Sequence, residues 1–247
     1  MSLTVLITRP NFDPVTSYFH YWGKLIIDAA REYNCKIIDL EGEKAILPVF
    51  TGHIQKTNPK LVLLHGHGSP NEVCGHKNQV LVDSHSADLL SGKIVYAVSC
   101  RAARELGPAS VRKGALAFIG YEEDFGFVTT LNREGNPAKD RMVQPFMRAS
   151  NEVSESLLKS KTVEKSYQNS QEVFKEEIRN HSISDARPEN KEIRFWLFWD
   201  MVYQKYHGSP DAQIDPLPFL LLNVFVSLMA TKSKFKGKEM DVRNPQN

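Results

Sequence analysis

The chain has 247 residues, of which 41% are hydrophobic and 24% are charged, and its formal net charge is +2. That length accommodates one substantial α/β domain with a large core, and the composition is ordinary for a soluble globular protein. The near-neutral balance gives no reason to expect a nucleic-acid partner. Three cysteines, Cys35, Cys74 and Cys100, stand at irregular spacing without a disulfide framework, which indicates a reducing compartment and predicts a cytoplasmic location.

The first half of the chain alternates between predicted strands and predicted helices. Short apolar and β-branched runs predict buried strands over 3–7, 35–40, 61–64, 94–98 and 115–120. Helical patterns cover 18–33, 43–56 and 101–113, and the last of these ends at Gly114. Turn-forming residues over 71–82 predict a small antiparallel hairpin. Strands that alternate with helices predict a mostly parallel sheet with helices on both faces.

The second half changes character and is predominantly helical. Long amphipathic patterns predict helices over 141–158, 162–180 and 191–206. The apolar stretch 217–230 is shorter than the roughly 20 residues that a membrane-spanning helix needs. We therefore expect no membrane partner, an apolar helix over 216–231 that packs on the domain, and a flexible charged tail over 232–247. At the other end, the run 3–7 is too short for the apolar core of a signal peptide.

Polar clusters follow the third and fourth predicted strands, at the point where each strand ends. His65 and His67 alternate with glycines after the third strand, and Ser99-Cys100 follows the fourth. Ligands bind outside the carboxyl ends of parallel strands, so on neighbouring strands His67 and Cys100 would face one another. A thiol near a histidine is the minimum constellation for nucleophilic acyl transfer. The dipole of the helix predicted to follow Cys100 would lower the pKa of its thiol, and Gly68 leaves its N–H free to approach a ligand.

The order of these motifs resembles a clan of cysteine peptidases. The strand 61–64 leading into Gly66-His67-Gly68-Ser69, followed by the strand 94–98 leading into Ser99-Cys100, is similar to the caspases, gingipains, legumains, separases and bacterial caspase-like peptidase domains. The stretch 100–121 resembles the prokaryotic members, and the segments 157–164 and 206–211 are similar to late parts of gingipain-like domains. The resemblance covers roughly residues 3 to 215. The caspase signature around the cysteine is only partly present, so the chain is not a close caspase.

The resemblance implies a fold, an activity and site residues. It implies a six-stranded, three-layer α/β sandwich over a domain 1–215, and a cysteine endopeptidase that needs no cofactor and no metal. His67 would be the acid toward the leaving amine, Cys100 the nucleophile, and the backbone N–H groups of Gly68 and Cys100 the oxyanion donors. The partner would be a protein or peptide substrate. Many relatives are held inactive until a partner binds or cleaves them, so a regulatory protein partner also fits the resemblance.

Charged residues near the strand ends are candidates for binding the substrate. The run Glu122, Glu123 and Asp124 follows the fifth strand and would favour a basic side chain before the scissile bond. Arg9 and Arg101 would favour an acidic one. Three carboxylates stand on the side of the nucleophile where relatives build part of that subsite, so the sequence favours cleavage after Arg or Lys.

Two pairs of residues that suit Zn²⁺, His65 with His67 and Cys74 with His76, leave room for other interpretations of the site. A zinc-dependent hydrolase using His65 and His67 is one alternative, although Ser69 and Pro70 stand where metallo-β-lactamase hydrolases carry Asp and His. His65 alternates with His67, so we expect its side chain to point away and to serve a structural or gating role. Cys74 lies in a turn-rich loop, where we expect it to be exposed or half-buried.

A non-catalytic interpretation also exists. Free cysteine is among the most buried residue types, so Cys100 alone would be compatible with a structural thiol; His67 opposite it favours catalysis. The aromatic run 195–199 and the apolar stretch 217–230 would suit a caspase-like interaction scaffold, but core burial explains both equally well. No Gly-x-Ser-x-Gly elbow supports an α/β-hydrolase.

Overall fold

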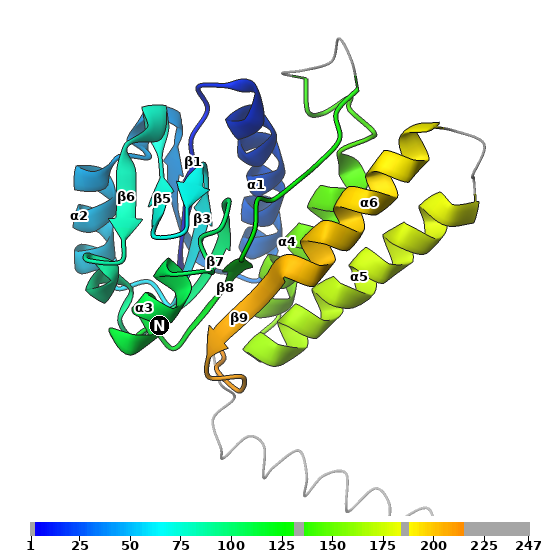
Figure 1. Ribbon diagram of the computed structural model, residues 1–247. Coiled ribbons are helices and arrows are strands. Elements are labelled where there is room, and N and C mark those ends of the chain that lie inside the picture. Colours follow the sequence, from blue (N-terminus) through cyan, green and yellow to red (C-terminus); the bar gives the residue numbers. More distant parts are fainter. Residues whose placement is uncertain (1–2, 131–135, 184–187, 215–247) are drawn as a thin grey trace, which may run out of the picture. The chain divides into compact units, whose positions relative to one another are not determined.

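A six-stranded sheet forms the centre of the computed structural model, which describes residues 3–130, 136–183 and 188–214 (Figure 1). The strands are β1 (Thr4–Arg9), β2 (Lys36–Glu41), β3 (Leu61–His65), β7 (Ile94–Val98), β8 (Ala117–Tyr121) and β9 (Gln204–Gly208). They pair in the order β2-β1-β3-β7-β8-β9, and only β9 runs antiparallel to its neighbour. The predicted mostly parallel sheet is therefore confirmed.

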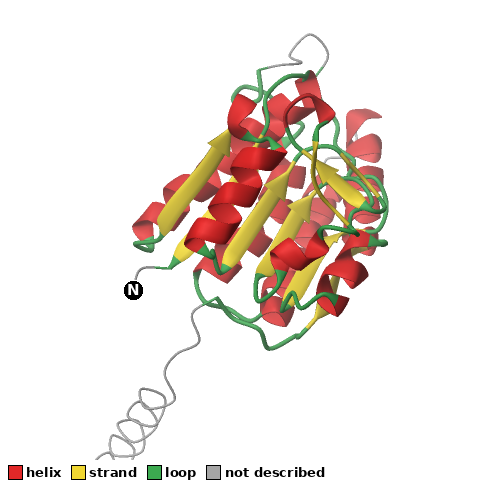
Figure 2. Cartoon of the chain, turned by 90° about the vertical axis from the view of Figure 1, so that its left-hand side faces the viewer, coloured by secondary structure: helices red, strands yellow, loops and turns green. Residues whose placement is uncertain are grey.

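Helices cover both faces of this sheet. They are α1 (Pro14–Glu32), α2 (Leu47–Thr57), α3 (Leu106–Arg112), α4 (Gln144–Leu158), α5 (Val163–Ile183) and α6 (Pro188–Tyr203). The buried side chains of α1, α4 and α5 share one core with the sheet, and those of α2 and α3 share another. Figure 2 shows the strands between the two helical layers. The predicted three-layer α/β sandwich is confirmed.

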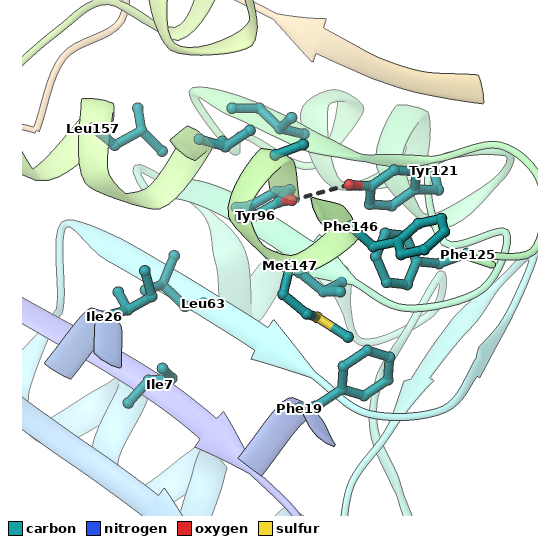
Figure 3. Packing of buried hydrophobic residues seen from close by; sticks show 14 of the residues in the cluster. Ile7, Phe19, Ile26, Leu63, Tyr96, Tyr121, Phe125, Phe146, Met147 and Leu157 are labelled. Carbon is teal, nitrogen blue, oxygen red and sulfur yellow. Dashed lines mark hydrogen bonds between the residues drawn. The ribbon is translucent and has the colours of Figure 1, made fainter. Parts of the chain in front are cut away.

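Side-chain alternation along the strands divides the core in two. Ile7 and Leu63 point into the cluster shared with α1 and α4, which Figure 3 shows, whereas Leu6 and Leu64 point into the other cluster. Successive side chains of a strand lie on opposite faces, so a strand with both faces covered must be apolar at nearly every position. All five residues of β3 and all five of β7 are buried, which is why these strands stand out in the sequence.

The predicted hairpin exists and has one strand more than expected. The strands β4 (Gly68–Ser69), β5 (Glu72–Cys74) and β6 (Val80–Asp83) form a separate antiparallel sheet. Three short 3-10 turns lie in the connections: η1 (Gly42–Lys44) between β2 and α2, η2 (His76–Asn78) between β5 and β6, and η3 (Ala87–Leu90) between β6 and β7. Cys74 is buried in β5, with 7% of its surface exposed, so the expectation of an exposed or half-buried cysteine is wrong.

The helix predicted over 101–113 is shorter than expected. Only Leu106–Arg112 is helical, and the residues after Cys100 form turns. Arg101 has the left-handed φ of 59°, which a right-handed helix excludes. Backbone N–H groups of Arg101 and Ala103 donate to the carbonyls of Glu123 and Tyr121, so this segment is tied to the end of β8.

The last residues of the helix predicted over 191–206 form the strand β9 instead. The pattern 191–206 predicted one helix, but α6 ends at Tyr203 and Gln204 begins the edge strand. An edge strand has one neighbour, so its sequence lacks the apolar run of an inner strand. The predicted apolar helix 216–231 and tail 232–247 lie outside the described residues. Among the helices that the structure describes, none has both the length and the apolarity to cross a bilayer.

Candidate functional site

Two polar clusters meet at the carboxyl edge of the central sheet. The strands β3 and β7 are parallel neighbours, with His65 paired to Val98 at their ends. His67 and Cys100 each follow two residues later. Both side chains line one pocket of about 670 Å³, together with residues from the start of α1, the segment 125–129 and α6. The predicted adjacency of the two strands is confirmed.

A carboxylate from α1 holds the His67 ring. The His67 Nε2 lies 2.7 Å from the Asp13 Oδ2. Asp13 is also the N-cap of α1, and its Oδ1 accepts a hydrogen bond of 2.8 Å from the Thr16 N–H. Burial raises the pKa of Asp13, but the hydrogen bonds from Thr16 and His67 outweigh it and hold this pKa below its ordinary value. An ionised carboxylate only accepts, so Nε2 carries a proton and Nδ1 is left to exchange one.

Cys100 carries its proton at neutral pH. Burial raises the pKa of its thiol to about 11, against a lowering hydrogen bond from the Phe125 N–H. The Asp124 carboxylate raises this pKa further, while the Arg101 guanidinium lowers it. Arg101 and Asp124 pair with each other at 2.9 Å. The predicted lowering by a helix dipole is wrong, because α3 begins only at Leu106.

Gly68 packs directly against the cysteine loop. A Cβ at this position would collide with the Ser99 Oγ and lie 3.1 Å from the Cys100 carbonyl oxygen, so the position needs glycine. The Cys74 N–H donates to the His67 carbonyl at 2.8 Å, which makes Gly68 and Val73 a non-hydrogen-bonded pair of the ladder. The Gly68 N–H therefore points away from β5 and is not used in pairing with it.

The charged candidates from the sequence do not line this pocket. Glu123 pairs with Arg104 at 2.9 Å and Asp124 pairs with Arg101, while the Glu122 N–H donates to a carbonyl of α6. None of the three carboxylates is among the pocket-lining residues. The run 122–124 thus supports the turn that follows β8.

Arg9 lies away from the pocket. It is 2% exposed, and its guanidinium forms two hydrogen bonds with the Asp39 carboxylate, at 2.9 and 2.5 Å. A third hydrogen bond, of 2.8 Å, goes to the His20 carbonyl. Because these donors are occupied inside the protein, we do not propose Arg9 as a substrate-binding residue.

His65 and His67 lie in different surroundings. His65 is 2% exposed and packs near Phe19, and burial, together with the charge of Arg9, lowers its pKa to about 4. His65 is therefore a neutral core residue that does not line the pocket. In the part of the chain that the structure describes, no three His, Cys, Asp or Glu side chains gather as a set of metal ligands.

Residues of α6 complete the pocket, and the sequence analysis did not place them there. Glu192 and Trp196 stand one helical turn apart and line it together. Glu192, with Glu189, also lines a second pocket of about 710 Å³ that shares Phe127 and Thr129 with the first. The spacing of 192 and 196 marks a common helix face, but nothing in the sequence brings that face to Cys100.

Comparison with known proteins defines the class of fold. By sequence, the chain matches no protein-family model and no curated protein. Among solved structures it is similar to the Arg-specific cysteine proteinase gingipain R (RGPB), with a TM-score of 0.53 and 14% identity over 85% of this chain. It is also similar to the complex of Porphyromonas gingivalis RgpB pro- and mature domains, with a TM-score of 0.55 and 12% identity over 85% of this chain. The chain spans 46% and 47% of those chains, less than half of their length. The fold is therefore the caspase-like α/β fold that gingipain R contains.

Proposed function

We propose that the chain is a cysteine endopeptidase in which Cys100 is the nucleophile and His67 its acid–base partner. The observation that carries the proposal is that both side chains line one pocket at the carboxyl ends of two adjacent parallel strands. An open α/β sheet binds its ligands outside the carboxyl ends of its parallel strands. The likeness to gingipain R supports the fold on which this site is built.

The proposed reaction proceeds through a thioester. The Cys100 sulfur attacks the carbonyl carbon of the scissile bond while its proton leaves for the His67 Nδ1. The N–H groups of Gly68 and Cys100 donate to the oxyanion that forms. The C–N bond then breaks as His67 returns the proton to the leaving amine, and water hydrolyses the thioester to free the thiol and an acid. Asp13 holds the ring in its tautomer and stabilises the imidazolium.

The raised pKa of Cys100 bears on the first step. With a pKa of about 11 the free thiolate is only about one part in 10,000 at pH 7. Forming the thiolate therefore requires His67 to take the proton from the Cys100 sulfur. A substrate that separates the sulfur from Asp124 would remove one of the contributions that raise this pKa.

We further propose cleavage after Arg or Lys, with Glu192 as the carboxylate that receives the basic side chain. Among the described residues that line the pocket, Glu192 is the one with a carboxylate side chain. Glu192 is exposed in the structure, and a bound substrate that excludes water from its carboxylate would let it favour a basic side chain over an acidic one. This assignment replaces Glu122, Glu123 and Asp124, of which the last two are engaged with arginines.

One observation favours a second, non-catalytic function. Phe195 and Phe198 on α6 are 55% and 56% exposed, which is unusual for large aromatic side chains and would suit a caspase-like interaction scaffold. The regulatory partner and the cytoplasmic location likewise stay predictions. None of the three cysteines, all of which lie in the described residues, forms a disulfide.

One experiment tests the peptidase proposal and its specificity. Peptides that differ only in Arg, Lys, Asp or Asn before the scissile bond are incubated with the protein and its Cys100→Ala, His67→Ala and Cys74→Ala variants. We expect cleavage of the Arg and Lys peptides, no cleavage by Cys100→Ala, and a loss of at least 100-fold in kcat/KM for His67→Ala. Cys74→Ala is the matched control, since Cys74 is a buried thiol whose pKa is also about 11 but which lies outside the pocket.

Three outcomes would count against these assignments. Activity that survives Cys100→Ala would exclude Cys100 as the nucleophile. A preference for Asp would exclude Glu192 as the receiving group. No labelling of Cys100 by a peptide-based acylating reagent, together with no turnover of any peptide, would favour the scaffold function.

A further inference from the structure

One wall of the Cys100 pocket is a short segment that has no regular secondary structure of its own. Residues 125–127 follow β8 and line the pocket, and the Phe125 N–H is the group that donates to the sulfur. The Phe125 ring is anchored in the core, 4.8 Å from the ring of Tyr121 (Figure 3). An irregular segment keeps its position only if its backbone groups find partners elsewhere.

The partners of this wall come from α6. The Trp199 Nε1 donates to the Asp124 carbonyl at 3.0 Å. The Trp196 indole lies so close to Gly126 that a Cβ there would collide with it. The Gly126 N–H donates to the Asp200 Oδ1 at 2.9 Å. Trp196, Trp199 and Asp200, which lie on one side of α6, thus contact the segment 124–126 and hold it in place.

Asp200 is the unusual member of this set. Its side chain is 0% exposed, and its Oδ2 is buried without a hydrogen-bond partner among the described residues. Burial raises its pKa well above the ordinary value, opposed only by the hydrogen bond from Gly126. A protonated carboxyl keeps one carbonyl oxygen, which accepts that hydrogen bond without placing a negative charge near Tyr96 and Tyr121.

We propose that Asp200 is a positioning residue, which fixes the wall 125–127 against Cys100 through its hydrogen bond with the Gly126 N–H. The expected effect of Asp200 on catalysis rests on the proposed function, that is, on the Cys100 pocket being a peptidase site. An apolar residue at 200 would leave the Gly126 N–H buried without an acceptor, so the wall would have to move to satisfy it. An amide at 200 would retain the acceptor.

The test compares three variants by two independent measurements. Asp200→Leu removes the acceptor, Asp200→Asn keeps it, and Leu157→Ala destabilises the same core cluster at its far end from Phe125 (Figure 3). Hydrogen exchange of the amides 124–127 reports the wall directly. Hydrolysis of the Arg peptide reports its effect on the site. Each variant is measured at the same number of degrees below its own melting temperature, so that differences in overall stability do not affect the comparison.

We expect Asp200→Leu to accelerate exchange of the Gly126 amide at least tenfold more than Leu157→Ala does, and to lower kcat/KM at least tenfold. Asp200→Asn is expected to restore the protection of this amide and kcat/KM to within about threefold of the wild type. Equal exchange at 124–127 in Asp200→Leu and Leu157→Ala would overturn the positioning role. If the wild type cleaves no peptide, the proposed function fails, and the exchange measurement still decides the role of Asp200.

Discussion

Cys100 and Asp124 form the least expected contact at the scale of single residues. A nucleophilic thiol beside a carboxylate is held in its neutral form, because the negative charge opposes formation of the thiolate. Here burial and Asp124 both raise the pKa of Cys100, to about 11, although Arg101 pairs with Asp124 and offsets part of that charge. A thiol that is held in its neutral form reacts slowly with oxidants and alkylating agents, because the thiolate is the reactive species.

Asp124→Asn is expected to make Cys100 more reactive. The substitution removes the carboxylate and leaves the Arg101 charge uncompensated, and both changes lower the pKa of the thiol. As the pKa of Cys100 falls from about 11, the fraction of thiolate at pH 8 rises about tenfold per pKa unit. A thiolate of lower pKa is also a weaker nucleophile, so the rate of alkylation rises less than the thiolate fraction does. We expect alkylation of Cys100 by iodoacetamide at pH 8 to be about three- to tenfold faster, measured by peptide mass.

Glu123→Gln is the matched control for that measurement. Glu123 is the preceding residue and pairs with Arg104 rather than with Arg101. It does not contribute to the pKa of Cys100, so we expect an unchanged rate. Equal rates for Asp124→Asn and the wild type would mean that burial alone keeps Cys100 protonated.

At the scale of elements, Arg9 joins β1 to its neighbours. Its guanidinium bridges the end of β1 to Asp39 on β2 and to the His20 carbonyl in α1, and its stem packs against Gly23 of the same helix. Arg9→Met would keep the stem and leave Asp39, which is 28% exposed, without its partner. Removing one member of a buried pair costs roughly 3–5 kcal/mol, and partial solvation of Asp39 reduces this to about 2 kcal/mol.

Urea unfolding of Arg9→Met measures that loss in the free energy of unfolding. The ratio of kcat/KM for Arg and Asp peptides should stay as in the wild type, because Arg9 does not line the pocket. Asp39→Asn supplies the comparison from the other side of the pair. A changed peptide preference with unchanged stability would return Arg9 to the group of substrate-binding residues.

Strands and helices whose own residues carry a clear pattern were predictable from the sequence. Elements that form because another segment pairs with them were not. All of β3 and β7 is buried between two helical layers, so their apolar runs are uninterrupted. By contrast, β9 exists because β8 offers an open edge, and its own residues do not specify a strand. The segment after Cys100 carries helix-forming residues, but its hydrogen bonds go to residues 121 and 123 instead.

The same distinction holds for the site when the whole molecule is considered. His67 and Cys100 were predictable because each follows a recognisable inner strand. Asp13 reaches His67 across 54 positions, and Asp200 reaches Gly126 across 74. Such contacts depend on how α1 and α6 pack on the sheet, which local patterns do not determine. A capping box at Asp13 and Thr16 marks only the start of a helix.

A truncation series tests which part of the chain makes up the folding unit. Met1–Ile214 forms one compact unit, which contains the six-stranded sheet and the Cys100 pocket. We therefore expect a fragment 1–214 to melt within about 4 °C of the full chain, the shift that roughly 1 kcal/mol causes in a domain of this size. A fragment 1–203 should not fold stably. It lacks β9, so β8 would become an open edge of the sheet. It also lacks Gln204, whose buried amide donates hydrogen bonds to the Tyr121 and Ser170 hydroxyls at 3.2 and 3.0 Å. Circular dichroism during heating measures both fragments, and a loss of more than about 10 °C for 1–214 would show that residues after Ile214 contribute to the core.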